Sequence, residues 1–268
     1  MRAIWSGAIN FGLVNIPVKV YSATNQHRLD LDMLDKKDHS RIRYARISTG
    51  SEKEIPFEDI VKGYKVGDEY VVVEKEDFEK VSPEKSKTID IVDFIEEDDI
   101  DSMYYEKPYF LEPDKTAARP YALLRDALKK SKKVGIAIFV FRNKQHIGVI
   151  KPSGNALILN QIRYADELRS PDELNLPGEQ AVKGKEIEMA LALIEQSTSD
   201  FDPSQYKDEY TAELLKLIEQ KAQGKTVKSP KTKIQKPTKP DDLMELLKAS
   251  LQKRKEARTS KPKQDRRK

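Results

Sequence analysis

Short apolar stretches bounded by turn residues fill the first two thirds of the chain. Seven of them are rich in β-branched and aromatic residues, which is typical of β-strands. We predict strands at Ile16–Tyr21, Arg41–Ile47, Glu69–Val73, Thr88–Phe94, Val134–Arg142, Ile147–Ile150 and Ala156–Tyr164. Because these stretches do not alternate regularly with helices, they predict an antiparallel sheet that is either closed into a barrel or covered by helices.

The stretch that begins at Val134 is apolar throughout, which predicts a strand buried on both faces. Polar segments at 142–146 and 151–155 resemble turns and lead to the next two predicted strands. These three strands are therefore predicted to form a meander.

Helical periodicity appears in three further places of the body. A helix at 120–130 would place Tyr121, Leu124 and Leu128 on one face. A helix at 183–196 repeats apolar residues at i, i+3, i+4 and i+7, namely Ile187, Ala190, Leu191 and Ile194. The last helix is predicted to begin at 201–205, where Asp202 can cap and Pro203 suits the first helical position, and to end at Gly224.

The composition changes after Gly224. The 44 residues 225–268 carry 16 Lys/Arg and 5 Asp/Glu, and subtraction from the totals of 49 and 45 leaves 33 and 40 for residues 1–224. A tail of net charge +11 thus follows a body of −7. Three prolines and no core-forming pattern predict a disordered linker, followed by a short amphipathic helix near 241–252.

This charge distribution points to a polyanionic partner, with nucleic acid first. Within the body, residues 119–165 are strongly basic, with ten Lys/Arg and one Asp. The helix at 120–130 would place Arg125, Lys129 and Lys132 on one face, away from its apolar side. Cations without interleaved aromatic residues favour the duplex backbone over stacked single strands. The alternative is a solvated face whose cations pair with the acidic segment 66–118.

The candidate DNA-binding residues lie in two regions of the body and two regions of the tail. In the body they are Arg41, Arg43, Arg46, Arg119, Arg125, Lys129, Lys130, Lys132, Lys133, Arg142, Lys144 and Lys151. In the tail they are Lys228, Lys231, Lys233, Lys236, Lys253, Arg254 and Lys255. The apolar face of the tail helix is the candidate partner-binding surface, comprising Leu243, Met244, Leu247 and Leu251. Folding of that helix back onto the body is the alternative.

No catalytic, metal or cofactor site is predicted. The chain has no cysteine, so disulfides, thiol catalysis and Cys-ligated zinc are excluded, and a reducing compartment is expected. The three histidines show no metal-ligand spacing. The acidic run 96–101 could bind magnesium in a nuclease, which stays an alternative, as does an architectural nucleoid protein. No long apolar run or leader pattern is present, so we expect a soluble cytoplasmic protein without membrane contact.

Several motifs, in order, closely resemble the bacterial Ku family. They span essentially all of residues 1–224: 1–24 (MRAIWSGAINFGLVNIPVKVYSAT), 41–44 (RIRY), 60–64 (IVKGY), 89–94 (IDIVDF), 107–115 (KPYFLEPDK), 120–125 (PYALLR), 200–203 (DFDP) and 206–210 (YKDEY). The tail, including its 242–251 element, resembles the lysine-rich extension of part of that family.

This resemblance implies a mixed α+β fold: an antiparallel β-barrel core of Ku type, similar to SPOC domains, with helical arms and a disordered basic C-terminal tail. It implies a core with a DNA-encircling bridge at 1–180, a helical arm at 181–224 and the extension at 225–268. It further implies a homodimeric, non-catalytic ring that threads onto linear duplex ends and recruits the ATP-dependent DNA ligase D in non-homologous end joining.

Overall fold

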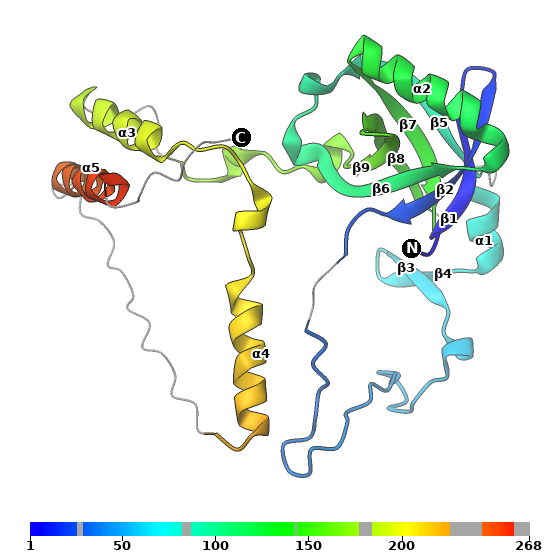
Figure 1. Cartoon of the computed structure of the whole chain (residues 1–268). Helices are drawn as coiled ribbons and strands as arrows, with labels where there is room; N and C mark the ends of the chain where they lie inside the picture. The colour runs from blue at the N-terminus through cyan, green and yellow to red at the C-terminus, as the bar shows by residue number, and fades with distance from the viewer. Residues whose placement is uncertain (26–28, 82–86, 143, 177–183, 226–242, 260–268) are drawn as a thin grey trace. The chain divides into compact units, whose positions relative to one another are not determined.

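A computed structural model of the chain describes residues 1–25, 29–81, 87–142, 144–176, 184–225 and 243–259 (Figure 1). Contacts divide the chain into two compact units, 1–173 and 174–268. The first contains a β-barrel, and the second contains three helices.

Seven strands form a closed barrel in the order β1-β2-β6-β9-β8-β7-β5. They are β1 (Trp5–Phe11), β2 (Val14–Ser22), β5 (Thr88–Glu96), β6 (Tyr105–Pro113), β7 (Lys133–Phe141), β8 (Lys144–Ser153) and β9 (Ala156–Ile162). All neighbours are antiparallel except β1 and β5, whose parallel pairing closes the barrel. The predicted α+β class with a barrel core is confirmed, and so is the meander β7-β8-β9.

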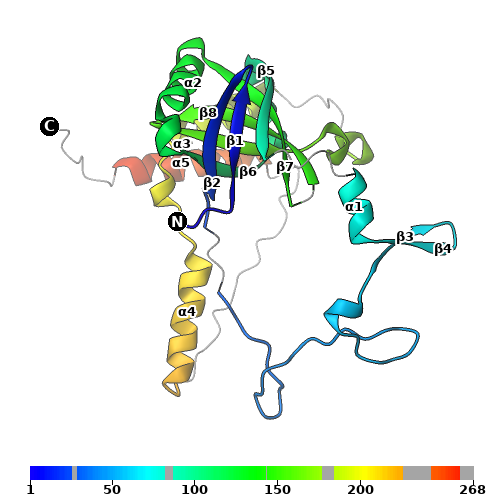
Figure 2. The same cartoon turned by 90° about the vertical axis from the view of Figure 1, so that its right-hand side faces the viewer.

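Alternating side chains of the strands fill the barrel interior, where Ile9, Ile16 and Ile89 are fully buried. Helix α2 (Ala118–Ser131) packs on the barrel through the face that carries Tyr121, Leu124 and Leu128, as its periodicity predicts (Figures 1 and 2). These three side chains join the same apolar core as the strands, which fixes the opposite side of α2 toward solvent.

The hydroxyl group of Tyr121 links two strands beneath α2. It donates a hydrogen bond to the carbonyl oxygen of Leu111 on β6 and accepts one from the N–H of Leu157 on β9, both at 2.6 Å. Leu111 and Leu157 are register partners. The tyrosine therefore satisfies two buried backbone groups and holds the helix, β6 and β9 together.

Two predictions about the strands are corrected. Residues 41–47 form no strand: only single bridges join Leu34 to Arg41 and Ile47 to Glu54, and no neighbouring strand covers the segment. In β7 the side chains that point into the barrel, such as Ala137 and Phe139, are buried, and on the outside Val134 is buried against Val149 and Ile162. The other outward residues, Ile136, Ile138 and Val140, are only half-buried, so the strand is not buried along both faces.

The remaining part of the first unit consists of short elements. They are the hairpin β3 (Lys62–Val66) and β4 (Glu69–Val73), helix α1 (Lys75–Val81), and 3-10 turns at 57–59, 97–99, 102–104, 115–117, 165–167 and 171–173. Strand β4 has the predicted bounds.

The second unit contains α3 (Gly184–Ser197), α4 (Glu209–Ala222) and α5 (Leu243–Thr259). Helix α3 is close to its prediction, but α4 starts later than predicted. Asp202 caps only one 3-10 turn, Pro203–Gln205, whereas Asp208 caps α4 by accepting from the N–H of Thr211 at 2.9 Å. Helix α5 continues seven residues beyond the predicted end at 252, and the predicted linker lies almost entirely outside the described residues.

Candidate nucleic-acid interface

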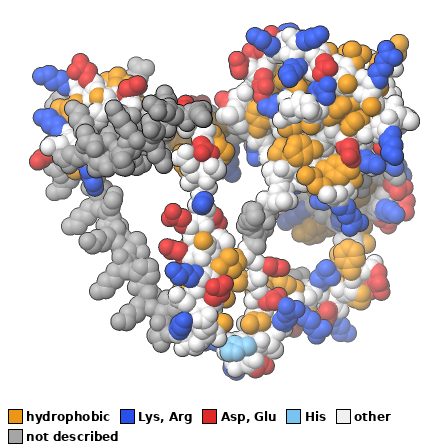
Figure 3. Space-filling view, viewed as in Figure 1, with side chains coloured by type: hydrophobic (Ala, Val, Ile, Leu, Met, Phe, Trp, Pro, Cys, Tyr) orange, Lys and Arg blue, Asp and Glu red, His pale blue; other side chains and the backbone are white. Residues whose placement is uncertain are grey.

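The solvent side of α2 carries cations that form no ion pair with another described residue, although the charges of Lys129 and Lys130 are near enough to Asp126 to help lower the pKa of its carboxylate. Arg119, Lys129 and Lys130 lie exposed on α2, and Lys132 is exposed just beyond its end. None of these four forms an ion pair with another of the residues that the structure describes. In Figure 3, Lys and Arg side chains gather over this part of the barrel. We call Arg119, Lys129, Lys130 and Lys132 the α2 cation group.

Lys132 belongs to this group, but it does not lie on a helical face as predicted. It does not continue the helix, because it is the C-cap residue and adopts a left-handed conformation with φ of 56°. It therefore does not share a helical face with Arg125. Lys129 and Lys130 lie in the last turn of α2, where cations interact favourably with the helix dipole.

The guanidinium group of Arg125 makes hydrogen bonds within the protein. It donates to Asp126 Oδ1 at 2.8 Å and to the carbonyl oxygen of Asn155 at 3.2 Å, and the Arg125 side chain is only 23% exposed. The hydrogen bond from Arg125 is the main reason why the pKa of Asp126 lies below its usual value. Arg125 thus anchors α2 to the turn between β8 and β9.

Three lysines of the meander are paired with carboxylates. Lys133 Nζ lies 3.0 Å from Glu96, and Lys144 Nζ lies 3.4 Å from Glu167. Lys151 pairs with Glu97 and also lies over the ring of Tyr105. These ion pairs lower the net positive charge that the meander presents to a phosphate.

The remaining predicted arginines of the body also have local contacts. Arg142 lies over the ring of Phe141, Arg46 lies over the ring of Phe57, and Arg41 pairs with Asp32 at 2.5 Å. Arg43 is exposed in the same segment as Arg41 and Arg46. This segment, residues 29–61, has one 3-10 turn and two single bridges as its regular structure.

The structure describes little of the tail. Lys253 is exposed on α5, whereas the side chains of Arg254 and Lys255 lie outside the described residues, as do Lys228, Lys231, Lys233 and Lys236 entirely. Of the predicted partner-binding residues, Met244, Leu247 and Leu251 are half-buried on α5, and the side chain of Leu243 is not described.

The described residues contain no candidate metal site. No three His, Asp or Glu side chains among them are gathered so that they could hold a metal ion, and this includes the acidic run 96–101.

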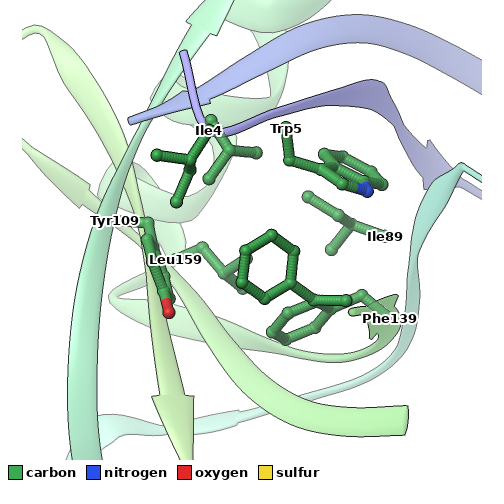
Figure 4. Close-up of a pocket in the computed structure, with 8 residues that line it drawn as sticks. Ile4, Trp5, Ile89, Tyr109, Phe139 and Leu159 are labelled. Atoms are coloured by element: carbon green, nitrogen blue, oxygen red, sulfur yellow. The ribbon is translucent and has the colours of Figure 1, made fainter. Parts of the chain in front are cut away.

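The narrow pocket in Figure 4 is lined by apolar and aromatic side chains, among them Trp5, Ile89 and Phe139. The one hydroxyl there, on Tyr109, donates to Gln161 at 3.4 Å, so the pocket belongs to the core. Nor does any described helix have the length and apolar character needed to cross a membrane.

Sequence reasoning missed one surface. Residues 31–72 expose many large apolar side chains, including Tyr44, which is 85% exposed, and Phe57, which is 76% exposed. The signal was present in the aromatic and β-branched residues of the segment, of which only those at 41–47 and 69–72 fall within predicted strands. Contiguous exposed apolar surface of this kind is typical of interaction sites.

A closed β-barrel covered by a helix with exposed cations defines a class of protein suited to bind a polyanion. The family model described as "Ku70/Ku80 beta-barrel domain" matches residues 10–189. Curated proteins named "Non-homologous end joining protein Ku" are similar over most of this chain. The one from Opitutus terrae is 41% identical over 230 residues, covering 84% of this chain and 83% of its own length. The one from Bacillus subtilis is 37% identical over 228 residues, covering 84% and 73%.

The chain belongs to the Ku family. The similarity reaches into the tail in some relatives: "Non-homologous end joining protein Ku 2" of Saccharopolyspora erythraea is 36% identical over 269 residues, covering 98% of this chain and 87% of its own length. The crystal structure of the SPOC domain of human PHD-finger protein 3 shares 13% identity with a TM-score of 0.29, covering 60% of this chain and 95% of its own. That TM-score supports no conclusion.

Proposed function

We propose that this chain binds the ends of linear duplex DNA in non-homologous end joining, as a homodimeric ring without catalytic activity. Membership of the Ku family, with relatives named for end joining over 84% of the chain, carries the proposal. The proposed organisation is a core with its bridge at 1–180, a helical arm at 181–224 and a lysine-rich extension at 225–268, in a cytoplasmic protein that associates with the nucleoid.

Contact with phosphates suits this task. A break can occur at any sequence, and contacts to the backbone carry no sequence information. The α2 cation group, Arg43 and the tail supply cations without base-reading elements. If about 6–10 phosphates are contacted, affinity should fall roughly 10³–10⁵-fold between about 50 and 200 mM salt.

The exposed apolar segment 31–72 supports the dimer. Its side chains, such as Tyr44 and Phe57, cannot be covered by the short bridges and the hairpin within the same segment. A second copy would bury them in an isologous interface, with the same surface contributed by both chains.

Recruitment of the ATP-dependent DNA ligase D is the third part of the proposal. Exposed apolar and aromatic residues support a protein-binding role for the second unit: Phe201 and Tyr206 contact each other with ring centroids 5.8 Å apart, and Tyr210 lies exposed on α4. The partner-binding role of Leu243, Met244, Leu247 and Leu251 is proposed alongside this surface and requires that these residues be exposed to the partner. Pull-down of purified ligase D with the full chain tests this part separately from DNA binding.

The experiment for the main proposal compares linear duplex with the same sequence as a covalently closed circle. We expect tight, salt-sensitive binding to linear duplex and weak binding to the circle, because a ring can be threaded only from an end. Light scattering should report two chains in solution and on DNA. Equal affinity for both forms would favour the architectural nucleoid alternative, and magnesium-dependent cleavage would favour the nuclease.

A further inference from the structure

Helix α3 has two apolar stripes, and only one of them is covered. On the first stripe Met189, Ala190 and Leu193 are half-buried. The second stripe is exposed and consists of Ile187, Leu191 and Ile194. Each stripe follows the spacing that places residues on one side of a helix, so the two lie on different sides.

Helix α5 carries a stripe that matches the covered one. Met244, Leu247 and Leu251 are half-buried at i, i+3 and i+7, whereas Leu246 and Lys248 beside them are exposed. Helices α3 and α5 pack against each other within the second unit (Figures 1 and 2). Since apolar helix residues lose exposure where another element covers them, these stripes identify the contacting faces.

Gln196 supports the same assignment of faces. It lies one turn after Leu193, and its side-chain oxygen is buried without a hydrogen-bond partner among the described residues. This side of α3 is thus covered to its C-terminal end.

We propose that α5 is an intrachain cover for the Met189, Ala190 and Leu193 stripe of α3. Another amphipathic helix can then occupy this stripe only after it displaces α5. Helix α5 has 17 residues, and most of the stability of a helix in a protein comes from packing of its apolar face. A segment of the same chain acts at an effective concentration on the order of millimolar. The tail helix thereby controls access to α3. This inference goes beyond the proposed function and does not depend on it.

Cysteine cross-linking tests which faces meet. The chain has no cysteine, so an introduced pair is the only thiol pair present. We expect Ala190→Cys with Leu247→Cys to oxidise rapidly to an intrachain disulfide at low protein concentration. The matched control, Leu191→Cys with Leu247→Cys, places one thiol on the exposed stripe and should oxidise much more slowly. Equal rates, or a disulfide between two chains, would overturn the proposal.

A peptide of residues 241–259 tests the covering itself. We expect it to bind the parent chain weakly and the full-length variant with Leu247→Ser and Leu251→Ser more tightly, because that variant leaves the stripe open. With an effective concentration of about 1 mM and a dissociation constant of about 100 μM for the peptide, the difference is about tenfold. A peptide with the same two serines should not bind. Equal binding to both proteins, or binding to neither, contradicts the proposal, and no DNA is involved.

Discussion

Replacing Lys129, Lys130 and Lys132 by Gln should weaken DNA binding and flatten its dependence on salt. These three residues are exposed and form no ion pair with another described residue, so a phosphate can approach them without breaking an ion pair. Asp126 offsets part of the charge of Lys129 and Lys130, but its side chain is bonded to Arg125. Arg125 is left unchanged, because its bonds to Asp126 and Asn155 anchor α2. The fold should therefore survive the triple change.

The magnitude follows from counterion release. Each phosphate contact contributes about 0.9 to the slope of log affinity against log salt. If all three lysines contact phosphates, the slope falls by about 2.7 per chain, and affinity at about 0.1 M salt falls by up to about 500-fold. The measurement is fluorescence anisotropy of a short labelled duplex over a salt titration, with thermal unfolding as the check on folding.

Two paired lysines provide the control. Lys133 and Lys151 already have carboxylate partners, Glu96 and Glu97, so replacing them by Gln should change the slope much less. If the control loses as much affinity as the triple variant, the ion pairs do not limit DNA contact. An unchanged slope in a folded triple variant would mean that the exposed side of α2 is an ordinary solvated face that does not contact DNA.

Two further predictions concern stability. Tyr121→Phe removes the hydrogen-bond partner of the buried Leu111 carbonyl and of the Leu157 N–H. It should therefore lower the free energy of unfolding, measured by chemical denaturation, by about 1–3 kcal/mol. A smaller loss would mean that these two backbone groups find other partners. Burial lowers the pKa of His146, which stacks on Phe139. As pH falls below about 6.5, the unfolded state therefore binds the proton before the folded state does, and the free energy of unfolding decreases. His146→Gln should lose less stability than the parent between about pH 7.5 and 5.5, and parallel pH profiles would contradict this.

The strongest periodic signals predicted their elements correctly. The apolar run of β7 and the 3.6-residue pattern of α2 were sufficient, because both bury a continuous face. Strand β1 was not predicted, since Gly7 and Asn10 interrupt its apolar pattern. The glycine is explained only by tertiary contacts: a β-carbon at Gly7 would lie 2.1 Å from the Lys87 carbonyl oxygen and 2.2 Å from the Trp5 ring. No local sequence signal shows that approach.

The sequence predicted which cations belong to the candidate site, but not which of them form ion pairs with carboxylates. Glu96 and Lys133 lie 37 residues apart, and they meet because the register of β5 with β7 places them opposite each other. A sequence pattern shows neither that register nor the contact of Lys151 with Glu97. For the same reason, the spacing of Arg125 and Lys132 suggested a shared face that the left-handed C-cap removes.

These pairings change how the charge of the barrel should be understood. Residues 119–165 sum to +9 and residues 66–118 to −11, yet the two segments are not separate patches, because Glu96 and Glu97 neutralise lysines of the basic segment. The α2 cation group forms no ion pair among the described residues, although Asp126 offsets part of the charge of Lys129 and Lys130. A barrel that reads phosphates through so few cations would bind weakly enough to slide along a duplex. Retention on DNA would then depend on closure of the proposed ring and on the tail, whose 16 Lys/Arg outnumber its 5 Asp/Glu.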